Sequence, residues 1–354
     1  MPSPTIPTRL TDPQKLHAFA VACLHELGVT PDNAAICADG MLLGETRNLT
    51  GQGQGFRKLV AYLSRIRKGE LDPRAPLTVV SDVGAVTLLD ANNGLGVVAG
   101  VRAMGRAIAR ARELGIAIVG VRGSTHFGTA AHHAMLALPH DLIGIAMTNA
   151  GAEMAPWGGY RAVIGTNPWS VAIPAGAERP IVLDMANTTA GKGMMDWLRR
   201  EGRPMPRDWA LTPDGRETDD PAEAMDGPLL PAGGPKGYGI AVVVDALAGV
   251  LTGAAFASAC YADPRKLDVG HQFIALDPAC FQPLAEFKAR MDALIREIKA
   301  TPTLPGFAEI MLPGEPEARR AEERLAHGIP LDQEIYTALA DVAQQLGVRF
   351  TVDR

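Results

Sequence analysis

The stretch from Val121 to Met135, V-R-G-S-T-H-F-G-T-A-A-H-H-A-M, holds the densest set of groups able to do chemistry. It follows an apolar run at 116–120 that is typical of a buried strand, and residues 130–138 after it are expected to form a helix. His126 and Gly128 therefore lie in a turn at a helix N-terminus. The backbone N–H groups there suit an anion such as a cofactor phosphate. The alternative is a turn histidine with only a structural hydrogen bond.

A second candidate is the polar, glycine-rich stretch 50–55, T-G-Q-G-Q-G, which precedes a helix predicted over 56–68. Lys58 lies near the start of that helix. Glycines allow a backbone to approach a ligand closely, although a plain linker would have the same composition.

Two isolated charged residues stand at positions that favour ligand contact. Asp184 ends a short apolar strand at 180–184, where it either caps the next segment or holds a ribose. Lys236 lies beside glycines at the predicted start of a helix, where it either contacts an anion or is solvated.

Composition indicates an enzyme and argues against several other classes. The chain has 354 residues, 47% apolar and 21% charged, which is enough for two domains. Its net charge of −5 and its lack of a long basic run predict no nucleic-acid or membrane partner. The four cysteines have no CxxC spacing, so we expect no metal site and a reduced, cytoplasmic setting.

One segment, Gly239–Ala259, is apolar enough to be mistaken for a membrane span. It contains Asp245 and several small residues, and no basic flank follows closely. A helix buried in the core is the preferred interpretation.

The two ends of the chain have similar helical patterns. A helix is predicted over 11–28 with a capping box of Thr11 and Gln14, and another begins at Thr30-Pro31. Charged helices are also expected over 284–299, 317–325 and 332–346. We therefore expect one helical domain from residues 1–75 and 278–354, around an α/β domain over 76–277.

The middle of the chain alternates strands, turns and helices. A strand at 85–90, glycines at 94, 96 and 100, a helix at 97–114 and a strand at 116–121 resemble one Rossmann unit. No acidic residue ends the second strand and no further unit follows, which weighs against that fold. Arg122 could still meet a ribose phosphate. Strand-rich runs follow at 142–149 and 162–174.

The order of motifs resembles the second malate/L-lactate dehydrogenase family, which also includes ureidoglycolate and sulfolactate dehydrogenases, diketogulonate reductase and piperideine/pyrroline-2-carboxylate reductase. The motifs are S-T-H-F-G at 124–128, G-T-N-P at 165–168, V-L-D-M-A at 182–186, K-G-Y-G at 236–239, L-P-G-E at 312–315 and H-G-I-P-L at 327–331. Each is weak alone, but the ordered set covers nearly the whole chain.

The resemblance implies a non-Rossmann nicotinamide-binding α/β (α+β) fold with a mixed sheet, a helical domain formed by both chain ends, and a homodimer. It implies NAD or NADP as cofactor and a small carboxylate as substrate, with Thr166 at a substrate position. The residues that match cofactor-contacting segments are His126, Phe127, Gly128, Thr129, Ala130, Asp184, Met185, Ala186, Pro235, Lys236, Pro313, Gly314 and Glu315.

The chain departs from this family at its catalytic motif. With Leu59 and Tyr62 setting the register, Gly53 and Gln54 replace the family's serine and catalytic histidine. Lys58, with Arg57 beside it, replaces the carboxylate-binding arginine. A glutamine amide does not titrate at neutral pH, and a lysine holds a carboxylate as a point charge and not as a fork.

Three functions follow from this departure. The first is an NAD(P)-dependent oxidoreductase for a 2-oxo acid or a cyclic 2-imino acid, with Gln54 orienting the substrate; the imine is favoured because a protonated imine needs no acid. The second keeps a keto acid and takes the proton from His126 or from water. The third is a family member that binds nicotinamide cofactor but has lost or changed its redox chemistry.

Overall fold

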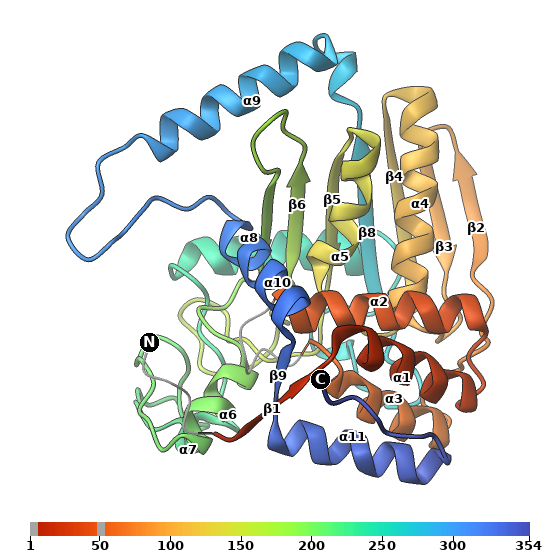
Figure 1. The fold of residues 1–354 in the computed structure, drawn as a ribbon, viewed down its shortest axis with the longest axis vertical. Coiled ribbons are helices and arrows are strands. Elements are labelled where there is room, and N and C mark those ends of the chain that lie inside the picture. Colours follow the sequence, from red (N-terminus) through yellow and green to blue (C-terminus); the bar gives the residue numbers. More distant parts are fainter. Residues whose placement is uncertain (1–5, 48–53) are drawn as a thin grey trace.

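A mixed seven-stranded sheet forms the centre of the computed structural model, which describes residues 6–47 and 54–354 (Figure 1). The strand order is β2-β3-β4-β8-β5-β6-β7. Only β3 and β4 pair in parallel, and the other pairs are antiparallel. The strands are β2 (Thr78–Val83), β3 (Val86–Asp90), β4 (Ile116–Ser124), β5 (Ile143–Thr148), β6 (Trp169–Ile173), β7 (Ile181–Met185) and β8 (Val269–Leu276).

This strand order agrees with the expected mixed α/β fold and not with a Rossmann sheet. The unit β3–α4–β4, with α4 at Gly96–Leu114, has the predicted strand–helix–strand order and parallel pairing. A Rossmann domain repeats such units into a mostly parallel sheet. Here β4 instead pairs antiparallel with β8, so the repeat stops after one unit.

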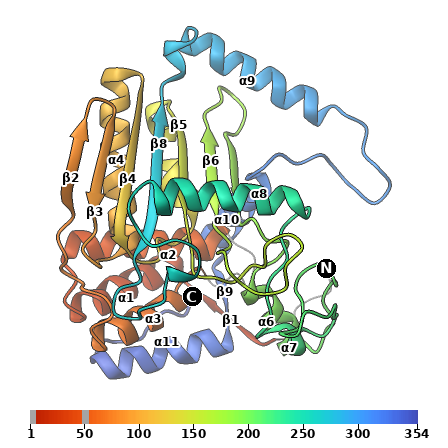
Figure 2. The same cartoon turned by 180° about the vertical axis from the view of Figure 1, so that it is seen from behind.

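Helices cover the two faces of the sheet unequally. On one face lie α4 and α5 (Ala130–Ala134) (Figure 1). Over half of the buried side of α4 is glycine or alanine in a spaced pattern, including Ala99, Gly100, Ala103, Ala107 and Ala111, which lets the helix lie close to the strands. On the other face, α8 (Pro235–Val244) and a π-helical turn (Asp245–Val250) cross the sheet (Figure 2).

The two chain ends share one buried core below the sheet. Leu16 and Phe19 from the N-terminal part pack in the same cluster as Leu339 and Val342 from the C-terminal part. The helices around it are α1 (Pro13–Glu26), α2 (Pro31–Arg47), α3 (Arg57–Arg67), α10 (Glu315–His327) and α11 (Gln333–Leu346). This shared core supports a helical unit built from both ends, whose limits at 1–75 and 278–354 stay a prediction.

The capping box predicted at the first helix is wrong. The Asp12 carboxylate accepts hydrogen bonds from the N–H groups of Gln14 and Lys15, at 2.9 Å each, and so caps α1. Thr11 belongs to β1 (Thr8–Thr11), which pairs with β9 (Ile329–Asp332). Its hydroxyl donates to the carbonyl of Ile329 at 2.8 Å, because the two chain ends meet there.

The segment expected to be a wholly buried core helix is only half buried. Helical structure ends near Val250, and the outward side chains of α8 and its π-helical turn are exposed, including Val243 at 55% and Val250 at 56%. In the described part of the chain, no helix is long and apolar enough to cross a membrane.

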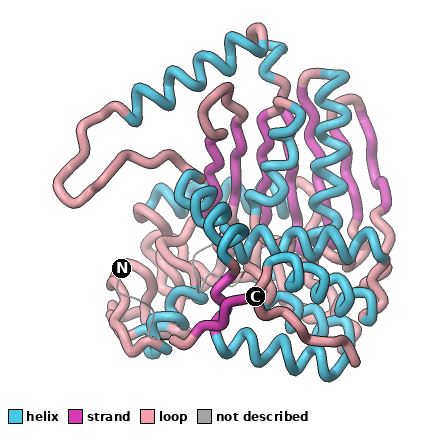
Figure 3. The backbone as a smooth tube through the Cα atoms, in the orientation of Figure 1, coloured by secondary structure: helices cyan, strands magenta, loops and turns pink. Residues whose placement is uncertain are grey.

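Three further helices lie away from the sheet's centre. α6 (Lys192–Arg200) and the short α7 (Pro221–Ala224) pack together in the proline-rich segment. α9 (Leu284–Lys299) projects from the body and returns through a long loop (Figure 3). Short 3-10 turns at Met135–His140, Ala257–Ala259 and Pro278–Cys280 complete the chain.

We predict opposite effects for two glycine-to-alanine substitutions in α4. A Cβ on Gly96 would lie 2.2 Å from the carbonyl oxygen of Thr125, whereas a Cβ on Gly105 would meet nothing within 4 Å. Gly96→Ala should lower the free energy of unfolding by about 1–3 kcal/mol through overpacking. Gly105→Ala should raise it by about 0.5–1 kcal/mol. Urea denaturation measures both, and equal stabilities would contradict the close packing at Gly96.

Candidate active site

The predicted S-T-H-F-G segment begins inside a strand and ends at a short helix. β4 runs through Ser124, three residues beyond its predicted end, so the turn itself starts at Thr125. α5 covers only five residues before a 3-10 turn continues it. The Thr125 hydroxyl donates to the carbonyl of Gly94 at 2.9 Å and accepts from the N–H of Gly96 at 3.0 Å. The turn is thus held against the start of α4.

Phe127 is held between two buried histidines. Its ring stacks on His133, with centroids 4.7 Å apart, and on His271, with centroids 4.8 Å apart. His133 donates to the carbonyl of Phe127 at 2.8 Å, and His271 hydrogen-bonds the hydroxyls of Ser124 and Thr148 at 2.8 and 2.7 Å. Burial lowers the pKa of His271 to about 3, so this stack is uncharged at neutral pH.

His126 has a defined tautomer and faces Lys58. Its Nδ1 accepts a hydrogen bond from the N–H of Gly128 at 3.0 Å, so the ring proton sits on Nε2. Nε2 lies 3.5 Å from the Nζ atom of Lys58. Burial and the positive charge of Lys58 hold the pKa of His126 well below its usual range. A neutral imidazole is a weak proton donor, which counts against His126 as the acid.

Lys58 and Arg57 point in different directions from α3. Arg57 is exposed and lies 4.0 Å from the carboxylate of Glu334. Lys58 is half-buried beside His126. Burial and the charges of Arg65 and Arg57 lower the pKa of Lys58 to about 8, while Glu153 opposes the shift. Of the two predicted carboxylate-binding cations, the structure brings only Lys58 to the histidine segment.

The backbone of Gln54 lies next to Thr129, in the segment that is predicted to contact the cofactor. Gly53 and the rest of 48–53 fall outside the described residues, so the predicted glycine replacement has no structural account. The carbonyl oxygen of Gln54 and the hydroxyl of Thr129 lie 2.5 and 3.2 Å from where a Cβ on Gly44 would stand. The Oε1 atom of Gln54 is buried without a hydrogen-bond partner among the described residues.

Asp184 occupies the helix end that was expected to bind a phosphate. Its Oδ2 accepts a hydrogen bond from the N–H of Ala131 at 3.1 Å, so the protein's own carboxylate caps α5. The side chain reaches solvent, yet the surrounding protein raises its pKa to about 6, against the opposing charge of Arg47. The half-buried Met185 and Ala186 follow Asp184.

The predicted Pro313–Glu315 segment is joined to β7 just before Asp184. The N–H of Val182 donates to the carbonyl of Pro313 at 3.0 Å, and Arg47 donates to the carbonyl of Gly314 at 3.4 Å. Gly314 has φ of +86°, a conformation that favours glycine.

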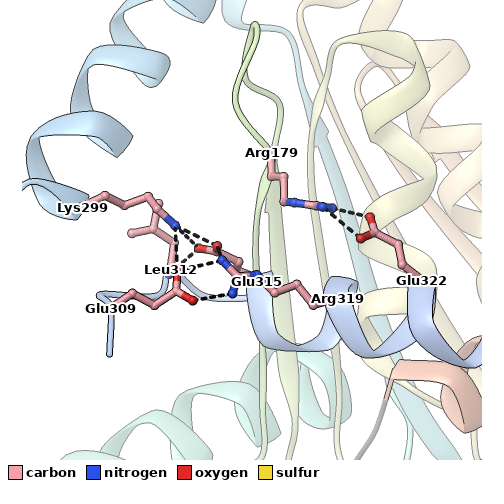
Figure 4. Close-up of polar contacts among 7 residues, drawn as sticks. All are labelled: Arg179, Lys299, Glu309, Leu312, Glu315, Arg319 and Glu322. Carbon is pink, nitrogen blue, oxygen red and sulfur yellow. Dashed lines mark hydrogen bonds and ion pairs between the residues drawn. The ribbon is translucent and has the colours of Figure 1, made fainter. Parts of the chain in front are cut away.

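Glu315 is already engaged by protein cations. Lys299, at the end of α9, donates to its two carboxylate oxygens at 2.7 and 2.8 Å, and Arg319 donates at 2.5 Å (Figure 4). Glu309 binds the same arginine, and Arg179 pairs with Glu322 nearby. Glu315 therefore anchors the turn, and its carboxylate is directed at these cations.

The two other predicted segments, at Thr166 and at Pro235-Lys236, meet at Asn187. Its N–H donates to the carbonyl of Thr166 at 2.9 Å, and its own carbonyl accepts from the N–H of Ala232 at 2.9 Å. A Cβ on Gly237 would lie 2.6 Å from that carbonyl, so the start of α8, with the exposed Pro235 and Lys236, packs here.

Four residues of this region were missed from the sequence: Arg47, Glu153, Asn187 and His271. Arg47 is a buried cation that joins α2 to Gly314, and His271 comes from the central strand β8, which was not predicted. No short motif marks them, because each acts through contacts with distant segments. Asn187 directly follows the V-L-D-M-A motif, and that position was the one available signal.

Two buried polar atoms, at Asn187 and Thr188, are available to a ligand. The Oδ1 atom of Asn187 and the hydroxyl of Thr188 are buried without partners among the described residues, beside Asp184–Ala186. They offer hydrogen bonds to a polar ligand. Within residues 6–47 and 54–354, no cluster of His, Cys, Asp and Glu side chains could hold a metal ion. Arg122 forms an ion pair with Asp90 at 3.0 Å.

Comparison with known proteins gives consistent matches over most of the chain. The family model described as malate/L-lactate dehydrogenase matches residues 11–340. A malate dehydrogenase of Pyrococcus abyssi is 35% identical over 344 residues, covering 95% of this chain and 94% of the relative. A (2R)-3-sulfolactate dehydrogenase (NADP(+)) of Chromohalobacter salexigens is 34% identical, covering 82% of this chain and 88% of the relative.

A solved structure of similar fold supports the same assignment. The sulfolactate dehydrogenase from Methanocaldococcus jannaschii superposes with a TM-score of 0.89 at 33% identity, covering 96% of this chain and 98% of that one. The ordered motifs, the mixed sheet and the family match over residues 11–340 agree. The chain therefore belongs to the malate/L-lactate dehydrogenase family of NAD(P)-dependent dehydrogenases.

Proposed function

We propose that this protein interconverts a small 2-oxo acid and the corresponding 2-hydroxy acid with a nicotinamide cofactor. The observation that carries the proposal is the approach of Lys58 Nζ to within 3.5 Å of His126 Nε2. It places a cation able to bind a carboxylate beside the segment that the family resemblance assigns to the cofactor. Relatives named malate and sulfolactate dehydrogenases act on 2-hydroxy acids of this kind.

The cofactor would lie along the segments that converge near β7. His126–Ala130, Asp184–Ala186, Pro235-Lys236 and Pro313–Glu315 are joined by the contacts of Ala131, Val182 and Asn187. When bound, the nicotinamide supplies or accepts the hydride. We propose NAD or NADP without choosing between them. Lys236 is exposed and available to a 2′-phosphate, whereas Arg122 is already paired with Asp90.

The substrate would be oriented by charge and by amide hydrogen bonds. Lys58 attracts the carboxylate as a point charge, and the nearby Arg65 adds to the positive potential. The buried amide oxygen of Gln54, which has no partner among the described residues, can accept a hydrogen bond from the hydroxyl of the 2-hydroxy acid. The partly buried Thr166 lies at the family's substrate position.

Reduction of a cyclic 2-imino acid is the second candidate. It is favoured by one observation, the replacement of the family's catalytic histidine by Gln54. A protonated imine already carries the proton that a ketone must receive. Replacing the histidine by glutamine therefore slows imine reduction less than ketone reduction. The third candidate is a protein that binds the nicotinamide cofactor but has lost or changed its redox chemistry.

We also propose a homodimer that covers the exposed apolar face of α8 and its π-helical turn. Ile240, Val243, Val250 and Leu251 lie along that face with 37–66% of their surface exposed. Homodimer interfaces are more apolar than ordinary protein surfaces, and a second copy would remove this patch from water.

A turnover screen tests the proposed reaction. With NADH and NADPH in turn, oxaloacetate, 3-sulfopyruvate and pyruvate should be reduced faster than pyrroline-2-carboxylate, measured by loss of absorbance at the nicotinamide band. Faster turnover of the imine would favour the second candidate. Cofactor binding seen by fluorescence, with no turnover of any substrate, would support the third and contradict the proposed function.

The dimer is tested by a matched pair of lysine substitutions. Val243→Lys should convert a particle of twice 37.4 kDa into a monomer in light scattering, because it places a charge in the apolar contact. Leu114→Lys is the control, since Leu114 is also about half exposed but ends α4 on the opposite face of the sheet. A parent protein that is monomeric, or a dimer unaffected by Val243→Lys, would contradict the proposed contact.

A further inference from the structure

We propose that Lys58 is the catalytic residue that gives the proton to the substrate carbonyl, and that His126 is the positioning residue that holds its amine. This deepens the proposed function and rests on it. The family's histidine is absent from the position of Gln54, so the proton must come from another group. Lys58 is a titratable side chain whose Nζ atom lies 3.5 Å from His126 Nε2.

The tautomer of His126 is the first argument. Because Nδ1 accepts from the N–H of Gly128, the ring directs an N–H at Lys58. An ammonium opposite that N–H would place two donors face to face, whereas a neutral amine can accept the hydrogen bond through its lone pair. His126 therefore stabilises the form of Lys58 that remains after a proton has left.

The charged groups around Lys58 also favour its neutral amine over its ammonium form. Arg57 and Arg65 come from its own helix, and the neutral ring of His126 lies 3.5 Å from its amine. Glu153, from the segment after β5, is the nearby acidic group, and Lys192 partly offsets its charge. With burial as the largest cause, the pKa of Lys58 falls to about 8, close to the range in which an acid catalyst is most effective at neutral pH.

One ammonium can serve both substrate oxygens. The carboxylate and carbonyl oxygens of a 2-oxo acid are on adjacent carbons, and an ammonium has three N–H donors. Lys58 can thus hold the carboxylate while one N–H points at the carbonyl oxygen. As hydride adds to the carbonyl carbon, the C=O π electrons move to the oxygen, which takes a proton from Nζ and becomes a hydroxyl. The amine left behind accepts from His126 and regains its proton from solvent.

The sign of the pH dependence follows directly. Reduction needs the protonated ammonium, so kcat/KM for a 2-oxo acid should be level below pH about 8 and fall above it. Oxidation of the 2-hydroxy acid needs the neutral amine, so its kcat/KM should rise through the same pH.

A charge-preserving substitution separates proton donation from carboxylate binding. Lys58→Arg keeps the positive charge but cannot release a proton near neutral pH. The expected result is a fall in kcat of about 10²–10⁴-fold for oxo-acid reduction, a smaller change in KM, and loss of the fall in rate above pH 8. Lys68→Arg makes the same change at an exposed residue at the end of the same helix and should leave kcat unchanged.

Two substitutions of His126 test its positioning role. Asn can replace Nδ1 as acceptor but leaves no donor facing Lys58, whereas Gln can place an N–H near the position of Nε2. His126→Asn should move the alkaline fall in rate upward by about 0.5–1 pH unit, the size expected for one hydrogen bond. His126→Gln should move it less. Circular dichroism and urea denaturation show that each variant is folded.

The outcomes are distinct. If the parent reduces a 2-oxo acid and Lys58→Arg keeps more than a tenth of its kcat, Lys58 only binds the carboxylate and the inference fails. If the parent reduces no oxo acid with either cofactor, the proposed function itself fails. An alkaline fall in rate that survives in Lys58→Arg would assign the proton to another group.

Discussion

The stacking of Phe127 between His133 and His271 is the constraint on which the site depends. It joins three parts of the chain, because His271 comes from β8, His133 from α5 and Phe127 from the turn between β4 and α5. The rings are uncharged and buried, so the contact resists changes of pH near neutrality. With Phe127 held, Gly128 is presented to His126, and the ring of His126 has one tautomer and one direction.

Several charged side chains lie around this stack, and most of them have a hydrogen-bond or ion-pair partner. The Asp184 carboxylate accepts a hydrogen bond from the N–H of Ala131, and Glu315 is paired with Lys299 and Arg319. Lys58 has weaker compensation, since Glu153 acts on it only at longer range. Partly compensated charge inside a protein is costly and is commonly kept where it has a chemical role.

The fold was largely predictable from pattern, and the site only in part. Apolar spacing and a register set by Leu59 and Tyr62 identified α3 and the position of Lys58. The central strand β8 was missed because the buried His271 and Gln272 interrupt its apolar run; His271 is paired across the sheet, a contact that no local rule reveals. The contact of Lys58 with His126 joins residues 68 positions apart, so it depends on tertiary packing that periodicity does not specify.

The apolar outer side of α8 has a consequence for how the protein behaves on dilution. This helix begins at Pro235 and Lys236, within a segment assigned to the cofactor, and its first turn packs on Asn187. The apolar face of α8, which the proposed dimer covers, would therefore be continuous with the region proposed to bind the cofactor. Specific activity would then decline in very dilute assays and recover on reconcentration, linking the enzyme's own abundance to its catalytic competence.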